Sequence, residues 1–427
     1  MKNYFLIIVA VIFSTSNSNS QQLAFPSAEG YGKYTTGGRG GKVIEVTNLE
    51  SSGPGSFLSA VEEKGARTIV FRVSGTIEAN ITVANDSITI AGQTAPGDGI
   101  TLKGMLKINA SNVIIRYIRI RAEAKDDAIG GRYQKNIIID HVSASWSKDE
   151  VMTFYHGENI TIQWCMITEA CSDTHKFGGI WGNNYGTYHH NLFAHNISRN
   201  PRFASSCGYN DFRNNVIYNW QHQSVYGGEK HQTDRGFQFS TINMIANYYK
   251  SGPGTHEKVR SRILDPSTRN GKEDAGKWWV SENFVVGFPD VTANNWKGVT
   301  KQDDHFKLSE PWLSMDINQE TAEEAYKSVL NSAGCSLPKR DIIDQRIIEE
   351  VRTGTATKGK NGFVANPQEA GGWPVLKNKP AHKDTDHDGM PDYWEEENKL
   401  DKNNSEDRNI VTLKGYTMLE TYINGIK

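Results

Sequence analysis

The sequence predicts an all-β fold, a parallel β-helix, followed by a small and mostly helical C-terminal extension that binds calcium. From about residue 68 the chain is a series of short β-branched runs, each bounded by Gly, Asn or Asp, as strands are. Three of these runs open with Asn112, Asn136 and Asn159, at intervals of 24 and 23 residues, which is a period typical of solenoids. No long amphipathic helix separates the runs, which disfavours alternating β/α folds. A β-sandwich or a propeller is the all-β alternative.

Residues 1–20 have the pattern of a signal peptide. Lys2 precedes an apolar run from Tyr4 to Phe13, and small polar residues follow this run. The run is too short to span a membrane, so we expect cleavage near Ser20 and a secreted protein, either extracellular or periplasmic. No other segment is long and apolar enough to cross a bilayer, so we expect no membrane span.

Residues 21–300 are predicted to form the solenoid. A coil of about two dozen residues has room for three short strands and their turns, and stacking of coils buries the apolar face that one coil alone leaves open. Asparagines at equivalent turns are expected to stack in hydrogen-bonded ladders. The runs that we assign to strands include "RTIVFRVSGTI", "NVIIRYIRIR", "NIIIDHVSASW", "NITIQWCMITEA", "GTYHHNLFAHN" and "NDFRNNVIYNW".

Residues 301–380 lack the strand-like pattern of the preceding segment and are predicted to lie over the solenoid. In "NQETAEEAYKSVLNSAG", Thr321 is a suitable N-cap, glutamates follow it, and Gly334 ends the pattern, so we expect a helix. A second helix is expected in "KRDIIDQRIIEEVRTG". The Gly, Pro and Lys content of the next stretch is typical of a wrapping segment or linker.

Residues 381–427 are predicted to form an EF-hand-like calcium-binding module. The stretch "DTDHDGMPDYWE", residues 384–395, has the ligand spacing of a twelve-residue calcium loop. Calcium takes six to eight oxygen ligands, and this loop offers carboxylates, one backbone carbonyl and a glutamate at the last position. A structural ion is favoured over a regulatory one, because only one short helix follows, in "GYTMLETYING". The predicted carboxylate ligands are Asp384, Asp386, Asp388, Asp392 and Glu395.

The charge balance and the cysteines limit the class of protein. With 47 Lys and Arg against 49 Asp and Glu, the net charge of -2 lacks the field of a nucleic-acid-binding protein, so no nucleic-acid partner is expected. Any anionic partner must then be bound by local cations. Four cysteines are too few for a disulfide framework. We expect buried free thiols, with a bridge between Cys165 and Cys171 as the alternative, and a monomeric protein.

Seven stretches, in this order, resemble the pectate lyases of polysaccharide lyase family 1, in particular the bacterial and fungal branch with a C-terminal calcium loop. The resemblance covers most of residues 24–300, and the tail from about residue 320 is similar to bacterial members. No single stretch is decisive, but seven in sequence make a chance match improbable. The stretches are "VTNLESSGPGSF", "RTIVFRVSGTI", "IAGQTAPGDGITLKG", "IIIDHVSASWSKDE", "THKFGGIWG", "HHNLFAHNISRNPRF" and "NDFRNNVIYNW".

The resemblance implies a right-handed β-helix that binds acidic polysaccharide and cleaves α-1,4-linked polygalacturonate by calcium-assisted β-elimination, giving 4,5-unsaturated oligogalacturonides. The proton on C5 is barely acidic, because its removal places a second negative charge beside the carboxylate. A metal ion and cationic side chains at that carboxylate would stabilise the enolate. By position, Arg199 in "SRNPRF" matches the family's catalytic arginine, which is assigned as the base. Because an arginine is almost always protonated, stabilisation of the enolate is its alternative role.

Further site residues follow from the same resemblance. Lys176 in "THKFGG" matches a lysine that contacts the substrate carboxylate, and Arg202 is expected to face the sugar acid as well. Pro201 keeps this stretch out of a helix interior, so both arginines should project from a turn or a strand end.

For the catalytic Ca²⁺, the resemblance points to Asp127 in "KDDAIGG" and Asp149 in "SWSKDEV". Asp126 and Glu150 are the alternatives, because a shift of one residue along a strand turns the side chain to the other face. A pair of acidic residues on neighbouring coils lies about one strand spacing apart and can share one ion.

Histidines near these stretches invite a catalytic interpretation as well. Asp140 and His141 in "IIIDHVS" could be read as general-base machinery, but we favour a structural tie between coils. His189 and His190 are expected to be ladder residues, because "HHN" lacks the partners of a zinc site.

Two departures from the family pattern leave the function open to alternatives. Thr153 stands where many members have a second carboxylate, and Ala204 stands where many have an arginine, a loss for which Arg202 or Arg213 would compensate. A lyase acting on esterified pectin and a non-catalytic β-helix that binds acidic polysaccharide therefore remain alternatives. A hydrolase would need clustered carboxylates, and the sequence shows none near Arg199.

Overall fold

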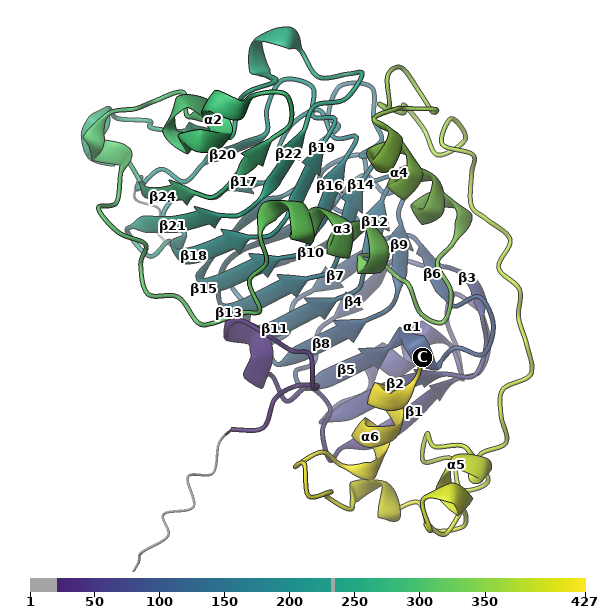
Figure 1. The fold of residues 1–427 in the computed structure, drawn as a ribbon. Helices are drawn as coiled ribbons and strands as arrows, with labels where there is room; N and C mark the ends of the chain where they lie inside the picture. The colour runs from purple at the N-terminus through teal and green to yellow at the C-terminus, as the bar shows by residue number, and fades with distance from the viewer. Residues whose placement is uncertain (1–20, 232–234) are drawn as a thin grey trace, which may run out of the picture.

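The computed structural model describes residues 21–231 and 235–427, which form a parallel β-helix (Figure 1). Apolar side chains of successive coils stack on one another inside it. Ile90, Ile115, Ile139 and Ile162 are aligned partners on neighbouring parallel strands, and all four are fully buried. Tyr188 continues this row. The predicted right-handed parallel β-helix is confirmed. The predicted signal peptide, residues 1–20, lies outside the described residues.

Each coil passes through three stacks of strands. The first stack contains β1 (Lys42–Val46), β2 (Arg67–Phe71), β5 (Ile88–Ala91), β8 (Val113–Arg116), β11 (Lys135–Asp140), the C-terminal parts of β13 (Met152–Gln163) and β15 (Ile180–His189), β18 (Gly208–Arg213), β21 (Ser240–Ile245) and β24 (Lys277–Ser281). The second stack contains β3 (Gly75–Glu78), β6 (Ile100–Lys103), β9 (Arg119–Arg121), β12 (Ser143–Ser145), β14 (Met166–Thr168), β16 (Leu192–Ala194), β19 (Val216–Tyr218), β22 (Tyr248–Lys250) and β25 (Phe284–Val285).

The third stack contains β4 (Ile81–Val83), β7 (Leu106–Ile108), β10 (Ile129–Arg132), the N-terminal parts of β13 and β15, β17 (Arg202–Phe203), β20 (Val225–Gly227) and β23 (Leu264–Pro266). Because β13 and β15 run through both the third and the first stack, these two stacks form one continuous sheet. From β9 onward, the loops that lead from the second into the third stack are longer than those of the first coils, and they position the site described below.

A buried asparagine ladder follows the corner between the first and second stacks. On each rung one side-chain amide donates to the amide oxygen of the next coil at 2.9–3.0 Å. The rungs are Asn191, Asn215, Asn247, Asn283 and Asn295. The expected ladder is also present at the predicted turn, where Asn159 donates to Asn136 at 3.1 Å. Such ladders satisfy buried polar groups that would otherwise lack partners.

The same corner carries a second ladder, made of rings. Tyr117, His141, Trp164 and His190 stand on four successive coils, each with a positive φ of 52–55°, and their rings stack with centroids 4.2–6.0 Å apart. Asp140 bonds to Arg116 of the preceding coil and to His141, both at 2.8 Å. The structural interpretation of Asp140, His141 and His190 therefore agrees with their contacts.

Helices cover the outside of the solenoid, as the residues after 300 predict. Thr321 and Glu324 form a capping box at the start of α3, and α4 has Asp341 as N-cap and Gly354 as its left-handed C-cap. Their apolar faces pack on outward side chains of the second stack such as Met166. The helices are α1 (Phe57–Glu62), α2 (Pro289–Ala293), α3 (Ala322–Ser332), α4 (Ile342–Thr353), α5 (Asp392–Glu397) and α6 (Met418–Gly425).

The C-terminal tail returns to the first coils, where α6 lies beside β1 and β2 (Figure 1). Met390, Leu419 and Ile423 of the tail are buried against Val70 and Ala91 of the solenoid. All four cysteines are buried free thiols, so the alternative bridge does not form. In the described part of the chain, every helix is too short or too polar to cross a bilayer. The domain boundaries at residues 300 and 380 stay predictions.

Candidate functional site

The loops before the third-stack strands bring most of the predicted site residues into one line. Asp127 precedes β10, Asp149 precedes β13, and Arg199 precedes β17, so each stands at an equivalent place on its own coil. Parallel bridges align Glu150 with Phe177 and Phe177 with Ser198. Because the coils stack in register, residues far apart in the sequence become neighbours across the coils.

Asp127 is a nearly buried carboxylate with little compensating positive charge. Its Oδ1 accepts the backbone N–H of Glu150 at 3.2 Å, and its Oδ2 lies 3.8 Å from Arg132. Burial, together with the charges of Asp149 and Asp126, raises the pKa of Asp127 to about 7. A carboxylate with so high a pKa is one that a cation would stabilise.

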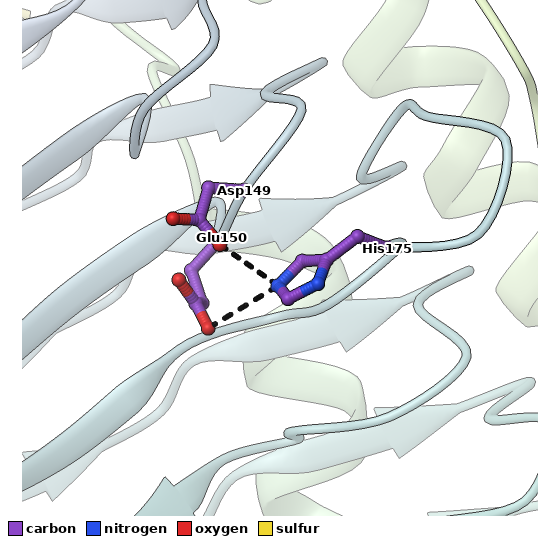
Figure 2. A group of neighbouring side chains, drawn as sticks. All are labelled: Asp149, Glu150 and His175. Carbon is purple, nitrogen blue, oxygen red and sulfur yellow. Dashed lines mark ion pairs between the residues drawn. The ribbon is translucent and has the colours of Figure 1, made fainter.

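Asp149 and Glu150 both face the imidazole of His175, as Figure 2 shows. The Nε2 atom of His175 lies 2.8 Å from Asp149 Oδ1 and 3.6 Å from Glu150 Oε1. Asp149 is partly exposed, whereas Glu150 is buried. Carboxylate oxygens of Asp126, Asp127 and Asp149 lie within 4.8 Å of one another, which is close enough for one metal ion to contact all three.

Arg199 lies next to this group of carboxylates. Its guanidinium forms an ion pair with Glu150 and stands over the ring of Phe177, with the guanidinium carbon 4.4 Å from the ring centroid. The residue has a φ of +57°, which is uncommon for a side chain larger than glycine, and it directs the chain into the short strand β17.

Lys176 and Arg202 are near this line but have other partners. The charged groups that act on Lys176 are Asp173 and Glu369, and burial lowers the pKa of the lysine. Arg202, in β17, forms an ion pair with the buried Glu229 at 2.6 Å. Contact of either side chain with substrate stays a prediction.

The two departures from the family pattern have plain structural roles. Thr153 is buried, and its hydroxyl bonds to Asp127. Ala204 is part of the apolar core. Arg213 is held by Asp211 at 2.8 Å and by Gln319 at 2.6 Å, on the first stack, so it does not lie in the line of site residues.

A hollow of about 130 Å³ opens beside Asp127 on the outside of the third stack. Lys107 and Arg132 supply positive charge to its wall. A Cβ atom at Gly130 would lie 3.0 Å from the carbonyl oxygen of Thr153 and 3.1 Å from Asp127 Oδ2, so glycine keeps this wall open. The hollow extends the site toward the first coils with room for an anionic group.

Carboxylates do cluster beside Arg199, so the expectation that none would do so is wrong. Strand stacking, which composition cannot show, brings Asp149 and Glu150 of one coil next to Arg199 of another. A hydrolase needs one carboxylate as a free acid or nucleophile, but Glu150 is already engaged by Arg199.

The calcium loop of the tail forms a second acidic group. Oxygens of Asp384, Asp386 and Asp388 lie within 4.8 Å of one another, and Asp388 and Glu395 form a second such group with Asp407. Asp392 does not join either group. Its carboxylate accepts hydrogen bonds from the N–H and hydroxyl of Thr385 and from Lys383.

Three residues of these sites were missed or left open by the sequence. Glu150 was only an alternative to Asp149, and His175 was passed over for its neighbour Lys176. The sequence offered one indication for His175, namely that it directly precedes the predicted site residue Lys176 in a loop before a strand. Asp407 lies 12 residues beyond Glu395, outside the loop spacing, so no local pattern indicates it.

Known proteins with similar sequences are pectate lyases. The chain is 36% identical over 432 residues to the probable pectate lyase C of Aspergillus flavus, which covers 95% of this chain and 94% of the relative. It is 35% identical over 435 residues to the probable pectate lyase C of Emericella nidulans, with 96% and 94% covered. No protein-family model matches the chain.

Solved structures share the fold at low sequence identity. Jun a 1, the major allergen from cedar pollen, aligns with a TM-score of 0.52 and 17% identity, covering 72% of this chain and 92% of the allergen. The thermostable pectate lyase PL 47 aligns with a TM-score of 0.53 and 14% identity, covering 74% and 98%. Because the curated relatives match over nearly their whole length, the chain belongs to the pectate lyase family.

Proposed function

We propose that this protein cleaves polygalacturonate by β-elimination, with Arg199 as its catalytic residue. The observation that carries the proposal is the guanidinium of Arg199 beside the carboxylates of Asp149 and Glu150 at the start of the third-stack strands. The two relatives named probable pectate lyase C support the same reaction class.

The reaction needs a base at C5 and stabilisation of the charge that develops there. Removal of the C5 proton leaves an electron pair that forms the C4–C5 double bond. The bond from C4 to the glycosidic oxygen then breaks, and that oxygen leaves with its electrons and takes up a proton. The products are a 4,5-unsaturated uronide and a new reducing end.

Arg199 acts as a base only when its guanidine is neutral, which is costly because arginine ordinarily stays protonated. In the free protein the guanidinium is paired with Glu150. A second partner for Glu150 would weaken this ion pair, and His175 Nε2, 3.6 Å from Glu150 Oε1, is within reach of the carboxylate. Arg199 can then take the proton from C5 and stabilise the enolate as it becomes charged.

Calcium fits the acidic group at Asp126, Asp127 and Asp149. All donors are oxygens, which a hard cation prefers, and the raised pKa of Asp127 reports a site with too little positive charge. When bound, calcium would supply positive charge that holds the substrate carboxylate and stabilises the enolate. With Thr153 in place of a further carboxylate, the substrate itself would complete the shell of ligands.

Lys176 and Arg202 are included in the proposal as substrate contacts. Arg202 shares Glu229 with Arg269, whose Nε lies 3.1 Å from the same carboxylate oxygen. Glu229 therefore keeps a cationic partner if Arg202 turns toward a uronate. Lys176 is only partly buried, in the loop that also carries His175.

The test is release of unsaturated uronide from polygalacturonate, followed by ultraviolet absorbance of the new double bond. We expect activity that calcium supports and a chelator abolishes. Arg199→Ala should lower kcat by at least about a thousandfold, as loss of a central catalytic group does. Arg352→Ala, which removes an exposed arginine on α4, is the matched control and should leave kcat unchanged.

Other outcomes would identify the alternatives. Activity on methylated pectin without calcium would indicate a lyase for esterified substrate. Binding of polygalacturonate without any unsaturated product would indicate a non-catalytic β-helix. Secretion, which residues 1–20 imply by their sequence, is tested by determining the N-terminal residue of the exported protein.

A further inference from the structure

The tail contains buried carboxylate oxygens that have no hydrogen-bond partner. Five side chains contribute them, and four of the five are at least nine-tenths buried. The unpartnered atoms are Asp384 Oδ1, both side-chain oxygens of Asp386, Asp388 Oδ2, both side-chain oxygens of Glu395, and Asp407 Oδ1. Buried polar atoms are normally satisfied, so a group of this size points to a missing ligand.

Protein cations do not neutralise this group. Among the described residues, Arg72 is the cation that forms an ion pair with any of the five, at 3.7 Å from Asp384 Oδ2. Burying several carboxylates together without a counter-charge is expensive, because each charge is desolvated and repels the others.

The loop spacing predicts that Asp392 is a ligand, but the contacts favour Asp407, which lies outside the loop. Asp392 occupies the ninth position of the loop, but its oxygens are used by Thr385 and Lys383. Asp407 accepts the N–H of Asp401 at 2.9 Å through Oδ2, which fixes the carboxylate and leaves Oδ1 without a partner. An oxygen of Asp407 lies within 4.8 Å of oxygens of Asp388 and Glu395.

We propose that these five carboxylates bind one calcium ion, with Asp407 as a ligand from outside the twelve-residue loop and Asp392 as a brace for the loop. Seven oxygen atoms are the number that Ca²⁺ takes readily, whereas Mg²⁺ demands six in strict octahedral geometry. The loop also keeps the hydrogen bond from Gly389 N–H to Asp384 Oδ2, at 3.0 Å, which closes the turn around the ion.

The ion would hold the tail on the solenoid. A Cβ atom at Gly389 would lie 3.0 Å from Val43 Cγ1, so the loop touches β1 at this point. The adjacent Met390 is fully buried against Val70 of β2. Arg72, which follows β2, donates to the carbonyl oxygen of His382 in the tail. Loss of the ion would leave repelling carboxylates directly beside these contacts.

The test is a calcium titration followed by hydrogen–deuterium exchange of peptides from residues 380–409 in the full chain. Exchange in this region should slow as calcium binds, and magnesium should be much less effective. Asp407→Asn, which is isosteric, should move the midpoint to at least about tenfold higher calcium. Glu396→Gln is the matched control, because Glu396 is an exposed acid next to Glu395 that pairs with Lys402. Its midpoint should stay within about twofold of the wild type, since an exposed ion pair contributes little.

Three results would overturn the proposal: no slowing of exchange by calcium, an unchanged midpoint in Asp407→Asn, or an equal shift in Glu396→Gln. Circular dichroism of each variant shows that it is folded. Because exchange of these peptides reports on the tail alone, the test is valid whether or not the site around Arg199 is catalytic.

Discussion

Asp149 and Glu150 are adjacent in the sequence and share His175 as a neighbour, but their other contacts differ. Asp149 is near Asp126 and Asp127, whereas Glu150 is buried and engages Arg199. The sequence left the choice between the two open, because one residue along a strand reverses the side chain. These different contacts are why the proposed function gives the metal to Asp149 and the ion pair with the arginine to Glu150.

Replacing Glu150 tests how Arg199 works. Glu150→Gln keeps the shape of the side chain but removes the negative charge that pairs with the guanidinium. If Arg199 is the base, the rising limb of the kcat–pH profile should move to lower pH, because the guanidinium then releases its proton without a paired carboxylate. A profile that keeps its position while kcat falls would contradict the base role and leave Arg199 as a cation that stabilises the enolate. Asp149→Asn, which alters calcium binding, is the comparison variant.

Residue-scale errors in the sequence interpretation come from contacts between distant segments. The motif around Lys176 was recognised, but which of two adjacent loop side chains faces the cleft depends on the loop path, and His175 contacts Asp149. Asp392 fits the calcium spacing, but Thr385 and Lys383 take its oxygens. Position in a motif predicts the region of a site better than it predicts the partner of each side chain.

The helices were predictable because their ends are encoded locally. Thr321 with Glu324, and Asp341 with Gly354, lie within or next to the helices that they cap. Where a helix docks depends on residues far away in the sequence. Glu350 of α4 is buried and lies 3.0 Å from His195 of a solenoid corner, a contact between residues more than a hundred positions apart.

This contact makes the stability of α4 on the solenoid depend on pH. Burial opposes ionisation of Glu350, but His195, Thr357 and Arg346 outweigh it and lower the pKa of Glu350 to about 2. Because the folded value lies below the ordinary value of 4.5, the stabilisation is present above about pH 4.5 and is lost as pH falls toward about 2.

Glu350→Gln should therefore lower the free energy of unfolding at neutral pH by about 3 kcal/mol. The difference from the wild type should shrink as pH falls below about 4.5, which denaturant unfolding at several pH values measures. Glu349→Gln is the matched control, because Glu349 is the exposed neighbour on the same helix. A Glu350→Gln difference that stays constant between pH 7 and 3 would contradict the role of its ionisation.

At the scale of the molecule, periodicity was enough to predict the fold. Equal spacing of strand-like runs implies stacked coils, since each coil repeats the same path and must bury the same face. The register then aligns residues such as Ile115 and Ile139. What periodicity does not predict is the return of the tail to the first coils, where Met390 packs on Val70, because no repeat links those segments.

The chain has two acidic centres, one before the third-stack strands and one in the tail. Calcium binding at one centre should be separable from calcium binding at the other. Asp149 belongs to the cleft and Asp388 to the tail, and the two groups share no residue. Asp149→Asn should raise the calcium concentration for half-maximal lyase activity by about tenfold while keeping the rise in unfolding temperature that calcium produces. Asp388→Asn should abolish that rise, of several degrees, and leave the calcium dependence of activity as it is. Thermal unfolding and lyase assays over one calcium series measure both quantities. If either variant changes both, the two centres are coupled through the solenoid, and the ion in the tail would then contribute to the geometry of the cleft.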